Sequence, residues 1–151
     1  MSPKIESEKR IMDNKLYHPI LGSVMWGQLA MCPDLSFSVS LLACFQANPG
    51  IDHWNALMHI MGYIKNTVDY GITYYQDSDL SPTTFVDADY GGCKDTCQST
   101  SGYVFTMAGG AVTWSSKWQA TVALSMVEAE YVSMSRCTQQ MVWMCSWLNE
   151  V

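Results

Sequence analysis

Basic side chains are scarce in this sequence. Lysine and arginine together number 8 against 14 aspartates and glutamates, which gives a formal net charge of -6 and a pI near 4.8. The only arginines are Arg10 and Arg136. Because proteins neutralise nucleic-acid phosphates with clustered lysine and arginine, this balance argues against a free-standing nucleic-acid binder.

Long apolar runs are missing as well. Pro33, Asp34, Asp52 and Lys65 interrupt the apolar stretches, which stay short of the ~20 residues that a membrane span requires. Residues 1–14 contain neither the apolar core nor the small-residue cleavage site of a secretory signal. We therefore expect no membrane partner and an intracellular protein.

The 6 cysteines form no recognisable metal-binding pattern. Cys93 and Cys97 are four residues apart and His53 and His59 are six apart, so zinc is an alternative that these pairs leave open. Without a secretory signal, reduced thiols are the expected state. We expect these cysteines to pack as small hydrophobes.

The composition, 48% hydrophobic and 15% charged, is that of a folded protein. The apolar residues 20–31 predict a helix, which Pro33 ends because proline lacks an amide donor. Asp34 is the expected N-cap of a second helix over about 35–46, which Asn48-Pro49-Gly50 breaks.

A third helix is expected to begin with Asp52 as its N-cap. Apolar residues then recur at the helical period and predict one buried stripe, which consists of Trp54, Leu57, Ile60, Met61 and Ile64.

After Tyr70 the pattern changes to the alternation typical of strands. In residues 83–89, alternation places two sets on opposite faces: Phe85, Asp87 and Asp89 on one, and Thr84, Val86 and Ala88 on the other. Residues 102–108 and 111–116 predict a hairpin joined by Gly109-Gly110, because glycine adopts the positive φ angles of a tight turn.

A long helix is predicted from Ser125 to the end of the sequence. Its apolar stripe consists of Val127, Tyr131, Met134, Met141, Cys145 and Leu148. The expected fold class is α+β. A polar lead (1–16) precedes a small helical unit (17–79), and three antiparallel strands with one long helix follow (82–151).

Several motifs stand in order in the helical half. They are YHPILGSVMWG at 17–27, Pro33-Asp34, Asn48-Pro49-Gly50, His53-Trp54 and YIKNT at 63–67. Together they resemble the end of the reverse transcriptase in copia-type retrotransposon Pol polyproteins. The resemblance implies that these helices correspond to the thumb and connecting region of that enzyme.

Further motifs follow in the second half. They are FVDADYGG at 85–92, STSGYVF at 99–105, GGAVTW at 109–114, SSKWQ at 115–119 and TVALSMVEAEY at 121–131. They resemble the opening of the ribonuclease H domain of the same polyproteins, so the match covers nearly the whole chain. The resemblance implies a truncated ribonuclease H-like fold.

In that family, clustered carboxylates hold two Mg2+ ions that cleave the RNA strand of an RNA/DNA hybrid. By position in the motifs, Asp87 is similar to the first catalytic aspartate and Glu128 to the catalytic glutamate, so both are the implied catalytic and metal-binding residues. Glu130 lies ~200° around the helix from Glu128 and cannot face the same ion. From the residues alone, Ser125 and Glu128 also fit a capping box, and Asp87 and Asp89 fit a solvated strand end.

The family's third aspartate lies on a strand beyond Val151. The resemblance therefore implies that at most two of the usual ligands remain, that Mg2+ and hybrid are bound weakly, and that the chain is an inactive remnant. The first strand would then present an open edge, which we expect to bind a protein partner or a second copy.

A second hypothesis is a non-enzymatic interaction protein. Some secreted effectors of plant-pathogenic oomycetes, which serve virulence inside host cells, look like such transposon pieces. The sequence has no R-x-L-R motif to support secretion.

Overall fold

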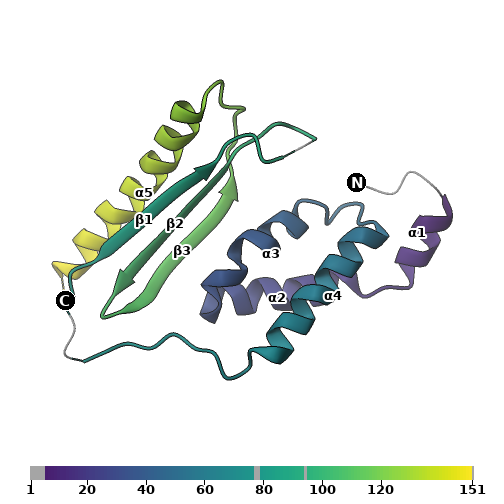
Figure 1. Cartoon of the computed structure of the whole chain (residues 1–151), viewed down its shortest axis with the longest axis horizontal. Coiled ribbons are helices and arrows are strands. Elements are labelled where there is room, and N and C mark those ends of the chain that lie inside the picture. The colour runs from purple at the N-terminus through teal and green to yellow at the C-terminus, as the bar shows by residue number, and fades with distance from the viewer. Residues whose placement is uncertain (1–5, 77–78, 94, 151) are drawn as a thin grey trace. The chain divides into compact units, whose positions relative to one another are not determined.

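The computed structural model describes residues 6–76, 79–93 and 95–150, and the chain divides into two compact units, Met1–Ile72 and Thr73–Val151. The first unit is helical, and the second consists of an antiparallel sheet with one long helix (Figure 1). The α+β class predicted from the sequence is confirmed. Among the helices of the described ranges, none combines the length and the hydropathy that a bilayer crossing needs.

The helical unit contains α1 (Glu6–Asp13), α2 (Tyr17–Met31), the 3-10 turn η1 (Pro33–Leu35), α3 (Ser36–Ala43) and α4 (Ile51–Asn66). Helix α1 lies within the segment that the sequence presents as a polar lead, and its Met12 is buried. Helix α2 ends where Pro33 follows, as predicted.

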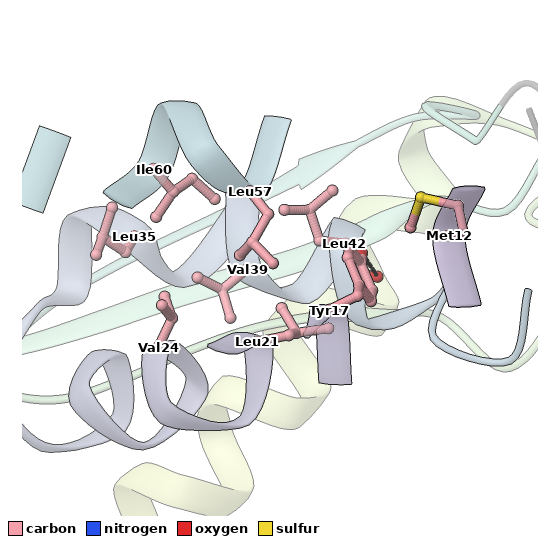
Figure 2. Packing of buried hydrophobic residues seen from close by; sticks show 9 residues of the cluster. All are labelled: Met12, Tyr17, Leu21, Val24, Leu35, Val39, Leu42, Leu57 and Ile60. Atoms are coloured by element: carbon pink, nitrogen blue, oxygen red, sulfur yellow. Dashed lines mark hydrogen bonds between the residues drawn. The ribbon is translucent and has the colours of Figure 1, made fainter. Parts of the chain in front are cut away.

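The side chains of one core cluster hold these helices together (Figure 2). The cluster consists of Met12, Tyr17, Leu21, Val24, Leu35, Val39, Leu42, Leu57 and Ile60. Leu57 and Ile60 confirm the predicted stripe of α4, and Trp54 and Ile64 pack at its border. Met61 is exposed, because it lies beyond the arc of α4 that faces α2 and α3.

Both predicted aspartate caps of this unit are wrong. Leu35 precedes α3 as its N-cap, and Asp34 instead accepts a hydrogen bond from the Tyr63 hydroxyl, which links η1 to α4. Gly50 is the N-cap of α4, and its amide donates to Nδ1 of His53 at 2.9 Å. The buried His53 ring stacks on Phe45, so a local cap and a tertiary contact together replace the expected role of Asp52.

The sheet consists of β1 (Thr83–Asp89), β2 (Thr100–Met107) and β3 (Gly110–Trp118) in the order β1-β2-β3. The predicted bounds of β1 are confirmed. The hairpin is also confirmed, but its two turn residues are Ala108 (φ 52°) and Gly109 (φ 82°), and not Gly109-Gly110. Gly110 pairs with Met107, which shifts the turn by one residue.

A bulge in β3 accompanies this shift. Phe105 pairs with Thr113 and Thr106 with Ala111, so that Val112 is the extra residue. Two tyrosines before β1 brace the hairpin, because the amide of Tyr75 donates to the carbonyl of Ala108 and the hydroxyl of Tyr74 donates to the carbonyl of Ala111. The segment from Thr73 therefore belongs with the sheet.

Helix α5 (Met126–Leu148) runs along one face of the sheet and packs against β1 and β2 (Figure 1). Its buried residues are Ala129, Ser133, Cys137 and Met144, and Phe105 of β2 packs with Cys137 and Met144. Of the predicted stripe of α5, only Leu148 packs against the sheet cluster, and the other members are exposed. The exposed members are Val127, Tyr131, Met134, Met141 and Cys145. Three of the four buried side chains of α5 are small, and small side chains allow the helix to approach the sheet closely. The exposed members of the more apolar stripe lie on another side of the helix.

The hydroxyl of Tyr17 is a testable anchor of the helical core. It is buried and donates to the carbonyl of Leu42 at 3.0 Å, and burial raises its pKa above the ordinary value of 10.0. The unfolded tyrosine loses its proton at a lower pH than the folded one. The neutral hydroxyl therefore contributes fully to the free energy of unfolding at pH values below the ordinary pKa. This contribution is lost as the pH rises from the ordinary pKa through the higher pKa of the folded protein.

We predict that Tyr17→Phe lowers the free energy of unfolding by about 1 kcal/mol at neutral pH, because the buried hydrogen bond from the Tyr17 hydroxyl to the carbonyl of Leu42 is lost. The difference from wild type should shrink above pH ~10. Urea denaturation followed by circular dichroism at several pH values measures both effects. A difference that grows with pH would contradict the assignment.

Candidate functional site

Strand β1 positions the two candidate aspartates. Ala88 packs with Ala129 of α5, and Val86 packs against the cluster that contains Cys137. Because successive side chains of a strand alternate, Asp87 and Asp89 lie on the opposite face, away from α5. Both are exposed, and Oδ1 of Asp87 accepts the amide of Ala88 at 2.9 Å. The face predicted from the sequence is confirmed.

The turn after β1 is held close to the start of β2. The amide of Gly91, which has a φ of 63°, donates to the hydroxyl of Ser99 at 3.1 Å, and Ser99 is buried. The carboxylate of Asp89 folds over Gly92, where a Cβ would overlap it. Asp89 is therefore directed toward its own turn.

Glu128 lies in the first turn of α5 and caps it. Its amide donates to the hydroxyl of the N-cap Ser125 at 3.2 Å, and its own Oε2 accepts the amide of Leu124 at 2.7 Å. The serine half of the predicted capping box is confirmed, whereas the carboxylate of Glu128 accepts the amide of Leu124 in place of the N-cap amide. A carboxylate at a helix N-terminus also interacts favourably with the helix dipole.

The structure brings the backbone of the two candidate residues close together but separates their side chains. Ala88 and Ala129, which follow Asp87 and Glu128 in the chain, belong to one buried cluster. Asp87 nevertheless projects from the far face of the sheet, and the carboxylate of Glu128 turns back to Leu124. Within the described ranges, no three histidine, cysteine, aspartate or glutamate side chains gather as metal ligands.

This arrangement does not fit a pair of Mg2+ ions. Magnesium requires oxygen ligands that converge in near-octahedral geometry, and it gives up its water reluctantly. Asp87 lies on the face of β1 away from α5, and the carboxylate of Glu128 in α5 already accepts the amide of Leu124. We therefore derive no catalytic step through a metal.

Two thiols near the sheet have shifted pKa values. Burial raises the pKa of Cys137, which packs against Phe105, in keeping with its predicted role as a small hydrophobe. A hydrogen bond from the side chain of Thr96 lowers the pKa of Cys93, and burial partly opposes it. All six cysteines lie in the described ranges, and none is paired in a disulfide.

A buried polar network positions the start of α5, and the sequence did not reveal it. Gln119 directly follows β3 and is 1% exposed. Its Nε2 donates to the hydroxyl of Ser101 at 3.0 Å and to the carbonyl of Ala129 at 2.8 Å, while its amide donates to the carbonyl of Ser99 at 2.8 Å. Gln119 therefore joins β2, β3 and α5. The only available signal was a glutamine at the end of the SSKWQ motif.

We predict that Gln119→Ala lowers the free energy of unfolding by about 2–3 kcal/mol, since buried groups of Ser101 and Ala129 lose their donor. Urea denaturation measures the change.

Ser133→Ala is the matched control. The hydroxyl of Ser133 is also buried in α5, but it has no hydrogen-bond partner among the described residues, so its removal should change stability by less than about 1 kcal/mol or increase it. Equal losses in the two variants would contradict a specific role for Gln119.

The geometry thus defines a protein with a three-stranded antiparallel sheet, a single covering helix and a helical unit before it. Comparison with known proteins shows the family. The chain is 38% identical over 133 residues to Secreted RxLR effector protein 161 of Plasmopara viticola. The aligned residues make up 88% of this chain and 94% of that protein. It is 35% identical over 151 residues to the Retrovirus-related Pol polyprotein from transposon TNT 1-94 of Nicotiana tabacum.

A similar match, 36% identical over 152 residues, is the Retrovirus-related Pol polyprotein from transposon RE2 of Arabidopsis thaliana. The chain belongs to the family formed by these transposon Pol polyproteins and the effector protein, and it is retrotransposon-derived. It spans only 11% and 10% of the length of the two polyproteins. No family model and no solved structure matches the chain.

Proposed function

We propose that this chain is a copia-type Pol segment with ribonuclease H ancestry that does not itself cleave RNA. Support for the ancestry comes from the order of the motifs and from identity to Pol polyproteins along the whole chain. A strand that carries Asp87 near its end, a hairpin and a helix with Glu128 in its first turn follow one another as the resemblance implies. The ribonuclease H-like fold is part of this proposal.

The positions of the two candidate carboxylates support the proposal that this chain does not cleave RNA. Glu128 accepts the amide of Leu124, and Asp87 lies on the face of β1 away from α5, so the two carboxylates do not converge. To bring Glu128 to a metal would break the cap, which costs roughly 1 kcal/mol, and would still leave Asp87 on the other side of the sheet. The net charge of -6 further weakens contact with a hybrid.

We predict no Mg2+-dependent cleavage of an RNA/DNA hybrid by these 151 residues above the level of the Asp87→Asn variant. Gel analysis of a labelled hybrid with Mg2+ measures this, and Asp89→Asn serves as a matched control on the same strand face. Cleavage by the wild-type chain and Asp89→Asn that disappears in Asp87→Asn would establish a working nuclease and overturn the proposal.

The relation to the effector protein favours a second candidate, a protein-binding function. This function would include delivery into a host cell and action on host proteins. The open edge of β1 supports it, because within the described ranges β1 pairs only with β2. The pairing of β1 contains no bulge, and the strand contains no proline or lysine, so Asp87 and Asp89 are the only charges that protect this edge. An extended strand of a partner could therefore be added here.

Hydrogen exchange tests the open edge. We predict that the alternate amides of β1 that point away from β2 exchange rapidly, while the amides of the central strand β2 are protected, because only β2 has a partner on both sides. Residue-resolved exchange by NMR measures this difference. Equal protection of every amide in β1 and β2 would show that the edge is already covered.

A further inference from the structure

Helix α5 presents a second apolar seam, separate from the face that packs on the sheet. Residues at positions 127, 131, 134, 138, 141 and 145 alternate in spacings of four and three, which is the heptad pattern of a coiled coil. They are Val127, Tyr131, Met134, Thr138, Met141 and Cys145. Leu148 continues the spacing but packs against the cluster that contains Phe105, so it belongs to the sheet-facing side. At ~100° per residue, the centre of this seam lies about a third of a turn from the buried face.

The seam is uncovered along most of its length. Tyr131 is 70% exposed, Val127 64% and Met134 49%, and these are large side chains in three successive turns. Within the described part of the second unit, α5 is the only helix, so none lies beside it in that unit (Figure 1). An uncovered heptad seam requires another helix to bury it.

We propose that α5 pairs with α5 of a second copy of this chain in an antiparallel dimer. In this dimer the two helices run in opposite directions about a two-fold axis near Arg136. Each seam residue then lies opposite a seam residue of the second copy. Val127 then faces Cys145, Tyr131 faces Met141, and Met134 faces Thr138, each pair occurring twice. Such self-complementarity is what a two-fold interface requires.

The charges of α5 select this direction. Glu128 and Glu130 flank the seam near its start, and the only basic residue of the helix is Arg136. A parallel pair would gather four glutamates at one end, where like charges repel. In the antiparallel pair, each Glu128 and Glu130 lies beside residues 142–144 of the other copy, Val142, Trp143 and Met144, which carry no charge.

A membrane surface fits the seam less well. Helices that bind anionic bilayers carry several lysines or arginines on the polar face, whereas α5 has one basic and two acidic residues in a chain of net charge -6. A helix of this length, ~35 Å, offers an interface at the lower end of the area that a stable dimer needs. We therefore expect a dissociation constant on the order of 10 μM.

Sedimentation equilibrium of the full chain tests the dimer over about two decades of concentration around ~10 μM. Tyr131→Glu and Met134→Glu should each weaken dimerisation at least tenfold, because each buries two charges in the interface. Gln139→Glu adds the same charge to an exposed position of α5 outside the seam and should leave the dimer intact. Circular dichroism should show unchanged helix content in all three variants, since these side chains are exposed.

Cross-linking tests the direction. In a chain with Cys44 and Cys97 replaced by serine, Val127→Cys should form disulfides with Cys145 of the second copy under mild oxidation. Ser135→Cys, which is exposed but outside the seam, should not form a disulfide with Cys145. Disulfides between the two Cys145 residues in the otherwise unchanged chain would show a parallel pair and overturn the proposal.

Two other outcomes also overturn it. A wild-type chain that remains monomeric at all concentrations would show that no second copy covers the seam. A dimer that survives Tyr131→Glu but is lost in Phe85→Lys would place the contact at the edge of β1, where Phe85 is exposed.

Discussion

The packing of α5 on the sheet is the constraint on which the second unit depends. A three-stranded sheet has two faces and two edges, and only a covering element gives it a buried core. Phe105 is fully buried against Cys137 and Met144, and the small Ala88 and Ala129 let the start of α5 approach β1 closely. The buried amide of Gln119 then sets the position of α5 along the sheet.

This same packing also directs the two candidate carboxylates, those of Asp87 and Glu128, to different places. Ala88 must face α5, and alternation therefore directs Asp87 to the other face. The helix start needs acceptors for its free amides, and the hydroxyl of Ser125 accepts the amide of Glu128. The carboxylate of Glu128 accepts the amide of Leu124 before the helix, and that of Asp87 accepts the amide of Ala88. Both carboxylates thus accept backbone amides that are close to them in the chain.

Two surfaces of the second unit are uncovered within the described residues, one on β1 and one on α5. The edge of β1 has unpaired backbone groups, and α5 exposes a seam with the period of a coiled coil. The two surfaces differ in what they can bind, since an edge accepts an extended strand and a seam accepts a helix.

Local signals in the sequence were sufficient for the elements themselves: the bounds of β1, the stop of α2 at Pro33 and the cap at Ser125 depend on neighbouring residues only. The same holds for the face that Asp87 shares with Asp89, because alternation is a property of one strand. Tertiary structure decided which of two apolar arcs of α5 is buried, since that choice depends on how closely small side chains approach the sheet. It also decided the partner of Asp34 and the role of Gln119, because each involves residues far apart in the sequence. The caps of α3 and α4 are local, and the packing of His53 on Phe45 favours Gly50 over Asp52 as the cap of α4.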